Sequence, residues 1–287
     1  GDAFKGPKSG GAVTPATLFR GLTPGDLNGP YLSQFLLQPF SFGTHPIEQR
    51  YATRPDGDDH LTHFNDWLVA QNGVRISKNV PNQLRRHIAT GRDLATYVHF
   101  DALYQAYLFA CVFLLDADAP YDAGNAYRDV RNQGGFVTWG GPHILNLVTE
   151  VSTRALKAVW HQKWYVHRRL RPEAYGGLVH LRFVGEGGDI KENYPIPEDV
   201  FNSDAVQAFV AANGTALLPM AFSEGSPTHP AYGAGHATVA GACTTILKAW
   251  FDESAIFGDQ IPNPVQSNED GSALVSYGDS ALTVGGE

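Results

Sequence analysis

Two segments of the chain carry regularly spaced apolar residues and predict long amphipathic helices. The apolar stripe of the first segment consists of Ile144, Val148, Val151, Ala155 and Val159. These spacings of three or four residues place the side chains on one face of a helix. Pro142 suits the first helical turn, whereas Pro172 disfavours the α conformation of Arg171 and should end the helix near that residue.

The second segment follows Gly233-Ala234-Gly235, a run of small residues that predicts a helix start. Its apolar side chains lie on one side of the expected helix: Val239, Cys243, Ile246, Leu247 and Trp250. Both segments therefore predict helices that bury one face against a common core.

The remaining pattern predicts further helices and one extended piece. Residues 82–116 carry apolar side chains at spacings of four or five and read as helical, and residues 199–212 predict a modest helix. Residues 178–184 predict a short, extended piece. The longest apolar run, 102–115, is interrupted only by Gln105. It is shorter than the roughly 18 residues that a membrane span needs, so it predicts a buried core helix.

Long loops separate these elements, since the chain holds 31 Gly and 18 Pro. Residues 1–80 predict a loop-rich wrapping segment, and residues 82–287 predict the helical core. We find no internal repeat and no clear linker. The fold class that follows is all-α, a single mostly helical domain over residues 1–287 with long Gly/Pro-rich loops.

Composition narrows the classes of partner. Among 287 residues, 43% are hydrophobic and 17% are charged, and the net charge is −8. This charge argues against a nucleic-acid or acidic-membrane partner recognised through the overall field, so any anion site must be local. Residues 1–11 have no basic and apolar signal-peptide pattern, and the chain looks trimmed or partial. We expect a soluble protein, and its compartment stays open, with a secreted or periplasmic location among the alternatives.

One local candidate for an anion site is a basic run at the end of the first long helix. Residues 154–171 contain six Lys and Arg and no Asp or Glu. Lys163 and His167 would be helical neighbours at i and i+4. A solvated basic face is the plain alternative. However, the same helix carries the apolar stripe, and Arg171-Pro172 places a guanidinium at a helix end beside Gly176-Gly177, which reads as a turn.

The second candidate is the start of the second long helix. Small residues before a helix let backbone N–H groups approach an anion, and the helix N-terminus adds about half a positive charge. His236, in the first turn, could exchange protons with a bound anion near neutral pH. Gly233-x-Gly235 alone is weak evidence, because such glycines often form only a turn.

Together these two motifs resemble those of the vanadium-dependent haloperoxidases, most closely the algal and cyanobacterial bromoperoxidases. The motifs span residues 163–172 and 229–236, reading Lys163, then Arg171-Pro172, then His229-Pro230-Ala231-Tyr232-Gly233-Ala234-Gly235-His236. Similarity extends through residues 29–31, 101–107, 140–144 and 237–238, and so covers nearly all of the chain. The resemblance implies the helical-bundle core shared by these enzymes and the related acid phosphatases.

The resemblance also implies roles for individual residues. Lys163 and Arg171 would bind equatorial vanadate oxygens, and the Gly235 N–H would add a donor. His236 would be the acid–base residue near the apical position. His229 stands where bromoperoxidases tend to carry His and chloroperoxidases an aromatic residue, so bromide and iodide are expected over chloride. The implied reaction oxidises halide with hydrogen peroxide to hypohalous acid, which halogenates a small organic substrate.

Two departures from the family pattern qualify these roles. Ala234 replaces the family's usual Ser, so one hydrogen bond to vanadate is lost. The family's third motif supplies an Arg and the vanadium-bonding His, but here the last Arg is Arg182 and the last His is His236. No vanadium ligand is therefore expected in this chain. The resemblance implies a C-terminal fragment or segment that carries both the Arg and the vanadium-bonding His.

Several alternatives stay open. The same pocket could serve a phosphatase, or the chain could be a non-catalytic, oligomer-forming homologue. For the haloperoxidase interpretation a homo-oligomer is expected. A structural calcium ion is a further candidate cofactor. Its oxygen ligands could come from Asp116, Asp118, Asp122 and Asn125, although their spacing is not that of a calcium loop.

Overall fold

A computed structural model describes residues 6–22, 24–27, 29–74, 84–186, 188–278 and 282–287. Its longer helices are α2 (Phe64–Gln71), α3 (Gly91–Phe100), α4 (Gln105–Asp116), α5 (Gly141–His161), α6 (Pro172–Phe183), α9 (Asp204–Asn213) and α10 (Gly235–Trp250). Shorter helical pieces are α1 (Pro24–Leu27), η1 (Gln34–Leu36), η2 (Gln162–His167), α7 (Gly188–Asn193), α8 (Glu198–Phe201) and η3 (Val284–Gly286). Two antiparallel pairs, β1 (Phe40–Phe42) with β2 (His45–Ile47) and β3 (Val265–Ser267) with β4 (Leu274–Ser276), are the strands among these residues.

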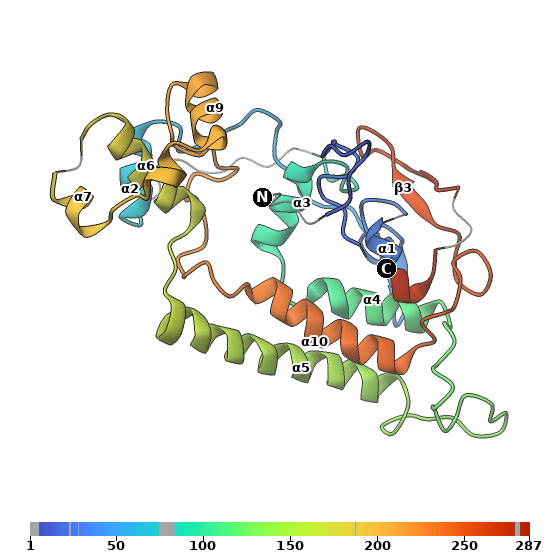
Figure 1. The fold of residues 1–287 in the computed structure, drawn as a ribbon. Coiled ribbons are helices and arrows are strands. Elements are labelled where there is room, and N and C mark those ends of the chain that lie inside the picture. The colour runs from blue at the N-terminus through green and yellow to red at the C-terminus, as the bar shows by residue number, and fades with distance from the viewer. Residues whose placement is uncertain (1–5, 23, 28, 75–83, 187, 279–281) are drawn as a thin grey trace.

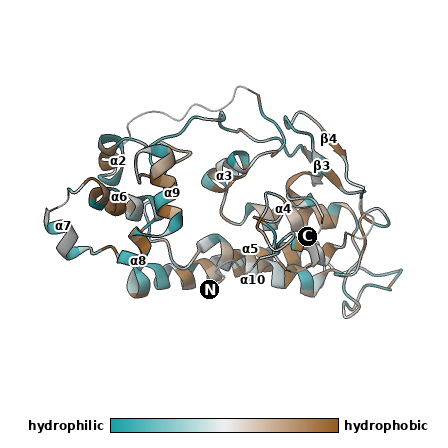
Figure 2. Cartoon of the chain, turned by 45° about the horizontal axis from the view of Figure 1, so that its top comes forward, coloured by the Kyte–Doolittle hydropathy of each residue, from teal (hydrophilic) through white to brown (hydrophobic). Residues whose placement is uncertain are grey.

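The main core lies between α4, α5 and α10, which run side by side in Figure 1. Ile144 and Val148 of α5 and Val239 and Cys243 of α10 are fully buried there. Both predicted apolar stripes are thus confirmed, and Pro142 lies in the first turn of α5 as expected. Figure 2 shows both apolar and polar residues along α5, as one buried face requires. The predicted mostly helical fold is confirmed.

The first long helix ends earlier than expected. After His161 the hydrogen bonding widens to a π-helical turn, η2, and Arg168 then adopts left-handed backbone angles with φ of 45°. Arg171 is therefore the residue that begins α6, and it does not lie at the end of the preceding helix. Pro172 begins α6. Proline is well suited to the first turn of a helix, because the N–H group that it lacks would have no intrahelical acceptor there.

The prediction of one continuous helical segment over residues 82–116 is wrong. Residues 84–90 are not helical, and residues 82–83 lie outside the described part. The remainder forms α3 and α4, which are separated by the non-helical residues 101–104 and bent by 98°. Thr90 caps α3 through a capping box with Asp93, which begins the helix at Gly91. The predicted buried core helix is confirmed in α4, since Ala110, Cys111, Val112, Phe113 and Leu114 are buried.

No single helix in the described ranges is long and apolar enough to cross a membrane. Within these ranges, only α3 and α4 taken together have the length and apolar composition of a membrane span, and they are bent relative to each other.

The extended piece expected at residues 178–184 is also wrong, because α6 runs through it. Gly176 and Gly177 lie inside this helix and form no turn. Their small size lets α6 pack closely: a Cβ on Gly177 would lie 2.0 Å from Trp67 of α2. Close packing here outweighs the weak helix propensity of glycine. The modest helix expected over 199–212 occurs as two helices, α8 and α9.

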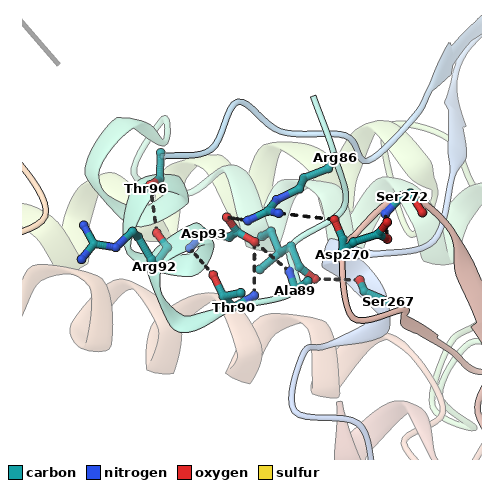
Figure 3. A network of polar contacts seen from close by, with 10 residues as sticks. Arg86, Ala89, Thr90, Arg92, Asp93, Thr96, Ser267, Asp270 and Ser272 are labelled. Atoms are coloured by element: carbon teal, nitrogen blue, oxygen red, sulfur yellow. Dashed lines mark hydrogen bonds and ion pairs between the residues drawn. The ribbon is translucent and has the colours of Figure 1, made fainter. Parts of the chain in front are cut away.

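A polar network fixes α3 to the C-terminal hairpin (Figure 3). The Asp93 carboxylate is fully buried, lies 2.8 Å from Arg86 Nη2, and accepts from the backbone N–H groups of Ala89 and Thr90. Arg86 also donates to the carbonyl of Asp270 in the loop between β3 and β4. Asp101 is the C-cap residue of α3, so this network anchors the helix that carries Asp101 at its opposite end.

Candidate functional site

Lys163 is the most unusual side chain of the predicted site. It lies in η2 and is only 1% exposed. Its Nζ donates to the carbonyl oxygens of Pro230 and Ala231, at 2.8 and 3.2 Å. Burial and the nearby charge of Arg171 lower the pKa of Lys163. No carboxylate among the described residues forms an ion pair with this ammonium group, so it is a buried cation held by neutral oxygens.

Arg171 and His229 form the adjoining pair. Arg171 Nε donates to the His229 carbonyl at 2.8 Å, and Nη2 lies 3.0 and 3.1 Å from the two ring nitrogens. His229 Nδ1 is also 3.1 Å from the Pro230 carbonyl. One tautomer satisfies both contacts: Nδ1–H donates to that carbonyl, and Nε2 accepts from Arg171. Burial first, and the charges of Arg171, Lys163 and His236 with it, lower the pKa of His229. A neutral imidazole is therefore favoured.

The segment before α10 brings these groups together. Its carbonyl oxygens at positions 229–231 accept from both Lys163 and Arg171. Upstream, Glu173 of α6 accepts from the N–H and the hydroxyl of Ser226, which ties the segment to the helix that Arg171 begins. Two cations from different helices thus share one stretch of backbone.

The N-terminus of α10 adds backbone donors. Ala234 is the N-cap residue and supplies no side-chain hydrogen bond to the first turn. The first N–H groups of a helix have no intrahelical partner, so those beginning at Gly235 are suited to an anion.

His236, in the first turn of α10, pairs with a residue whose role the sequence did not indicate. Its Nε2 lies 3.0 and 3.1 Å from the two carboxylate oxygens of Asp101. The Asp101 side chain is 6% exposed and that of His236 is 43% exposed. Asp101 stands in one of the stretches similar to the haloperoxidases, but no spacing rule joins it to a residue so distant in the sequence.

The structure thus brings Lys163, Arg171, His229 and the start of α10 into one neighbourhood, with His236 close enough to influence His229. The rest of the basic run behaves as the plain alternative predicts: Arg154 is exposed and pairs with Glu150 along the same helix. The site therefore draws on two of the six cations of that run.

The calcium expectation finds no support. Asp116 accepts from the Ser41 N–H, and Asp122 and Asn125 accept from backbone N–H groups within their own loop. No group of three or more His, Cys, Asp or Glu side chains suited to a metal occurs within the part of the chain that the structure describes.

Known proteins similar in sequence to this chain are bromoperoxidases. A vanadium-dependent bromoperoxidase of Corallina pilulifera is 40% identical over 96% of this chain, and one of Ascophyllum nodosum is 34% identical over 97%. This chain is similar to the vanadium-dependent bromoperoxidases over nearly all of its length. No family model matches it.

A solved bromoperoxidase structure supports the fold. The homohexameric second vanadate-dependent bromoperoxidase of Ascophyllum nodosum superposes with a TM-score of 0.78 and 32% identity, over 92% of this chain and 45% of that one. The chain also spans about half the length of the curated bromoperoxidases, 53% and 51% for the Corallina pilulifera and Ascophyllum nodosum proteins. The bromoperoxidase resemblance predicted from residues 163–172 and 229–236 is confirmed.

Proposed function

We propose that this chain forms the vanadate-binding part of a haloperoxidase that oxidises bromide or iodide with hydrogen peroxide. The observation that carries the proposal is the buried Lys163, which lies beside Arg171 and has no carboxylate partner among the residues that the structure describes. A cation with a lowered pKa in such a place is best stabilised by an anion, because attraction offsets the unfavourable burial of its charge. The similarity to vanadium-dependent bromoperoxidases supports vanadate as this anion.

The donor set fits a tetrahedral or trigonal-bipyramidal oxyanion. Lys163 keeps one N–H beyond its two carbonyl bonds, and no hydrogen bond from Arg171 Nη1 is found among the described residues. The uncapped N–H groups at Gly235 add neutral donors. Vanadate, when bound, would supply a Lewis-acid centre that polarises hydrogen peroxide for attack by halide.

His236 would transfer protons as the acid–base residue, and Asp101 would hold its ring in position. The buried carboxylate fixes the His236 ring through Nε2, and the partial exposure of that ring leaves it open to water and peroxide. His229 is a positioning residue for Arg171, and its neutral ring also contacts Trp160 with centroids 4.9 Å apart. We infer from His229 that bromide and iodide are preferred over chloride.

The proposal extends to the rest of the protein. The resemblance requires a vanadium-bonding His and a further Arg, and no residue after His236 in these 287 can play either part. We therefore assign both to additional polypeptide. We also propose a homo-oligomer, supported by the hexameric Ascophyllum nodosum structure, and a small organic molecule as the halogen acceptor. Calcium finds no supporting group of ligands in the part of the chain that the structure describes.

Vanadate titration tests the site itself. We expect Lys163→Met and Arg171→Met each to weaken binding of vanadate about tenfold or more, since each removes a charged donor. Lys157→Met is the matched control, because Lys157 lies exposed on α5 and removes the same charge. Equal binding by all four proteins would contradict the assignment.

Activity separates the two enzyme classes. Bromination of a phenol that requires vanadate, peroxide and bromide supports the haloperoxidase, and the protein should be assayed together with its C-terminal polypeptide. Hydrolysis of a phosphomonoester without vanadate, and no bromination, would replace the proposal with a phosphatase.

A further inference from the structure

A second cavity lies between α3 and residues 51–54, away from Lys163. Its volume is about 360 Å³, and its walls include Tyr51, Arg54, Tyr97, Phe100 and Asp101. Small-molecule sites commonly measure about 300–1,000 Å³ and combine apolar walls with few polar groups. This cavity has such a size and such walls.

Arg54 is the cationic residue in the lining of the cavity, and it is only 7% exposed. The guanidinium carbon lies 5.4 and 5.8 Å from the ring centroids of Phe100 and Phe222. These rings offer the guanidinium N–H groups no oxygen or nitrogen acceptor. Nε and Nη1 are buried and find no hydrogen-bond partner among the described residues. The charges of Glu224 and Asp58 favour the charged form of Arg54. Nε and Nη1 nevertheless stay buried without a hydrogen-bond partner among the described residues, which is unfavourable, and a ligand acceptor would satisfy them.

Tyr97 presents a second unpaired donor in the same cavity. Its hydroxyl is buried and also finds no partner within the described ranges. Burial raises the pKa of Tyr97, so the hydroxyl keeps its proton and can donate at neutral pH. The ring is fixed edge-to-face against Tyr51, with centroids 5.2 Å apart. Two independent buried donors thus line one cavity.

We propose that this cavity binds a small organic carboxylate. Arg54 and the Tyr97 hydroxyl would donate to the carboxylate oxygens, and the rings of Tyr51 and Phe100 would contact an aromatic or alkyl body. An inorganic anion would satisfy the donors but leave the aromatic walls without contacts. Asp101 would repel an anion beside it, so the carboxylate must lie at Arg54 and the apolar body toward Asp101.

This site is separate from the proposed vanadate pocket but adjoins it through Asp101. The Asp101 carboxylate lines the cavity and also holds His236. Binding of a carboxylate should therefore perturb the His236 ring resonances, although vanadate binding is not required for it. Loss of the vanadate assignment would leave this proposal intact.

Calorimetric titration with benzoate, at constant ionic strength, tests the proposal. We expect saturable one-to-one binding, weakened about tenfold or more in Arg54→Met and several-fold in Tyr97→Phe. Arg50→Met is the control, because Arg50 lies on the same segment, bonds the Ser272 carbonyl and does not line the cavity. Circular dichroism spectra verify that each variant is folded, and Tyr97→Phe keeps the aromatic wall.

Three results would overturn the assignment. The first is no saturable benzoate binding by the unmodified protein, and the second is equal affinity in Arg54→Met and Tyr97→Phe. The third is binding of phosphate in place of benzoate, which would identify an inorganic anion site. Movement of the His236 resonances by benzoate in the unmodified protein but not in Arg54→Met would support it.

Discussion

Replacing Asp93 by alanine should destabilise the fold strongly. Asp93 is completely buried, and its carboxylate is paired with Arg86 at 2.8 Å while accepting from two backbone N–H groups before α3. Breaking a buried ion pair costs about 3–5 kcal/mol. Arg86 is 24% exposed and can be partly rehydrated, which favours the lower end. Thr90 still caps α3, but loss of the reciprocal half of the capping box adds up to about 1 kcal/mol. We therefore expect a loss of about 3–4 kcal/mol in the free energy of unfolding.

Urea denaturation followed by tryptophan fluorescence measures this loss. Glu150→Ala is the control, because it removes an exposed pair with Arg154 at 2.6 Å and should cost only about 0.3–0.5 kcal/mol. An Asp93→Ala loss below about 1 kcal/mol, similar to that control, would refute the reasoning. It would mean that the network in Figure 3 does not fix α3.

Other expectations follow from single contacts. Gly177→Ala should destabilise by about 1–3 kcal/mol, because its Cβ would overlap the Trp67 ring, whereas Gly91→Ala has open space and should be near neutral in the same denaturation assay. Burial and Arg171 lower the pKa of Lys163, so this residue contributes stability that rises with pH toward about 10, where the unfolded chain binds more protons. Burial raises the pKa values of Cys111, Cys243 and Tyr51, which act in the opposite direction. The slope of stability against pH should therefore become more negative in Lys163→Met, and an unchanged slope would contradict the reasoning. Burial raises the pKa of the Cys111 thiol to about 12, so peptide mapping should find it alkylated only after unfolding.

Periodicity predicted α5 and α10 well because each buries one continuous stripe, which a single sequence displays directly. It failed where two effects compete at one residue. Pro172 can end one helix or begin the next, and only the packing of η2 decides between them. Gly176-Gly177 reads as a turn until Trp67, from a distant segment, is placed against it.

The candidate site shows the same division. Local motifs and resemblance pointed to Lys163, Arg171, His229 and His236, whose neighbourhood the fold then produced. Asp101 was missed because its contact with His236 depends on the bend between α3 and α4. Helical patterns on both sides of a bend do not encode its angle.

The carbonyl groups at positions 229–231 have a consequence for protein engineering. Lys163 and Arg171 come from different helices, and both donate to this short stretch. Its length therefore fixes the positions of both cationic side chains relative to each other. Neighbouring side chains can be varied in a library without altering the length of this backbone stretch. An insertion or deletion within it would displace both cations at once relative to α10, so diversity is better introduced by substitution than by change of loop length.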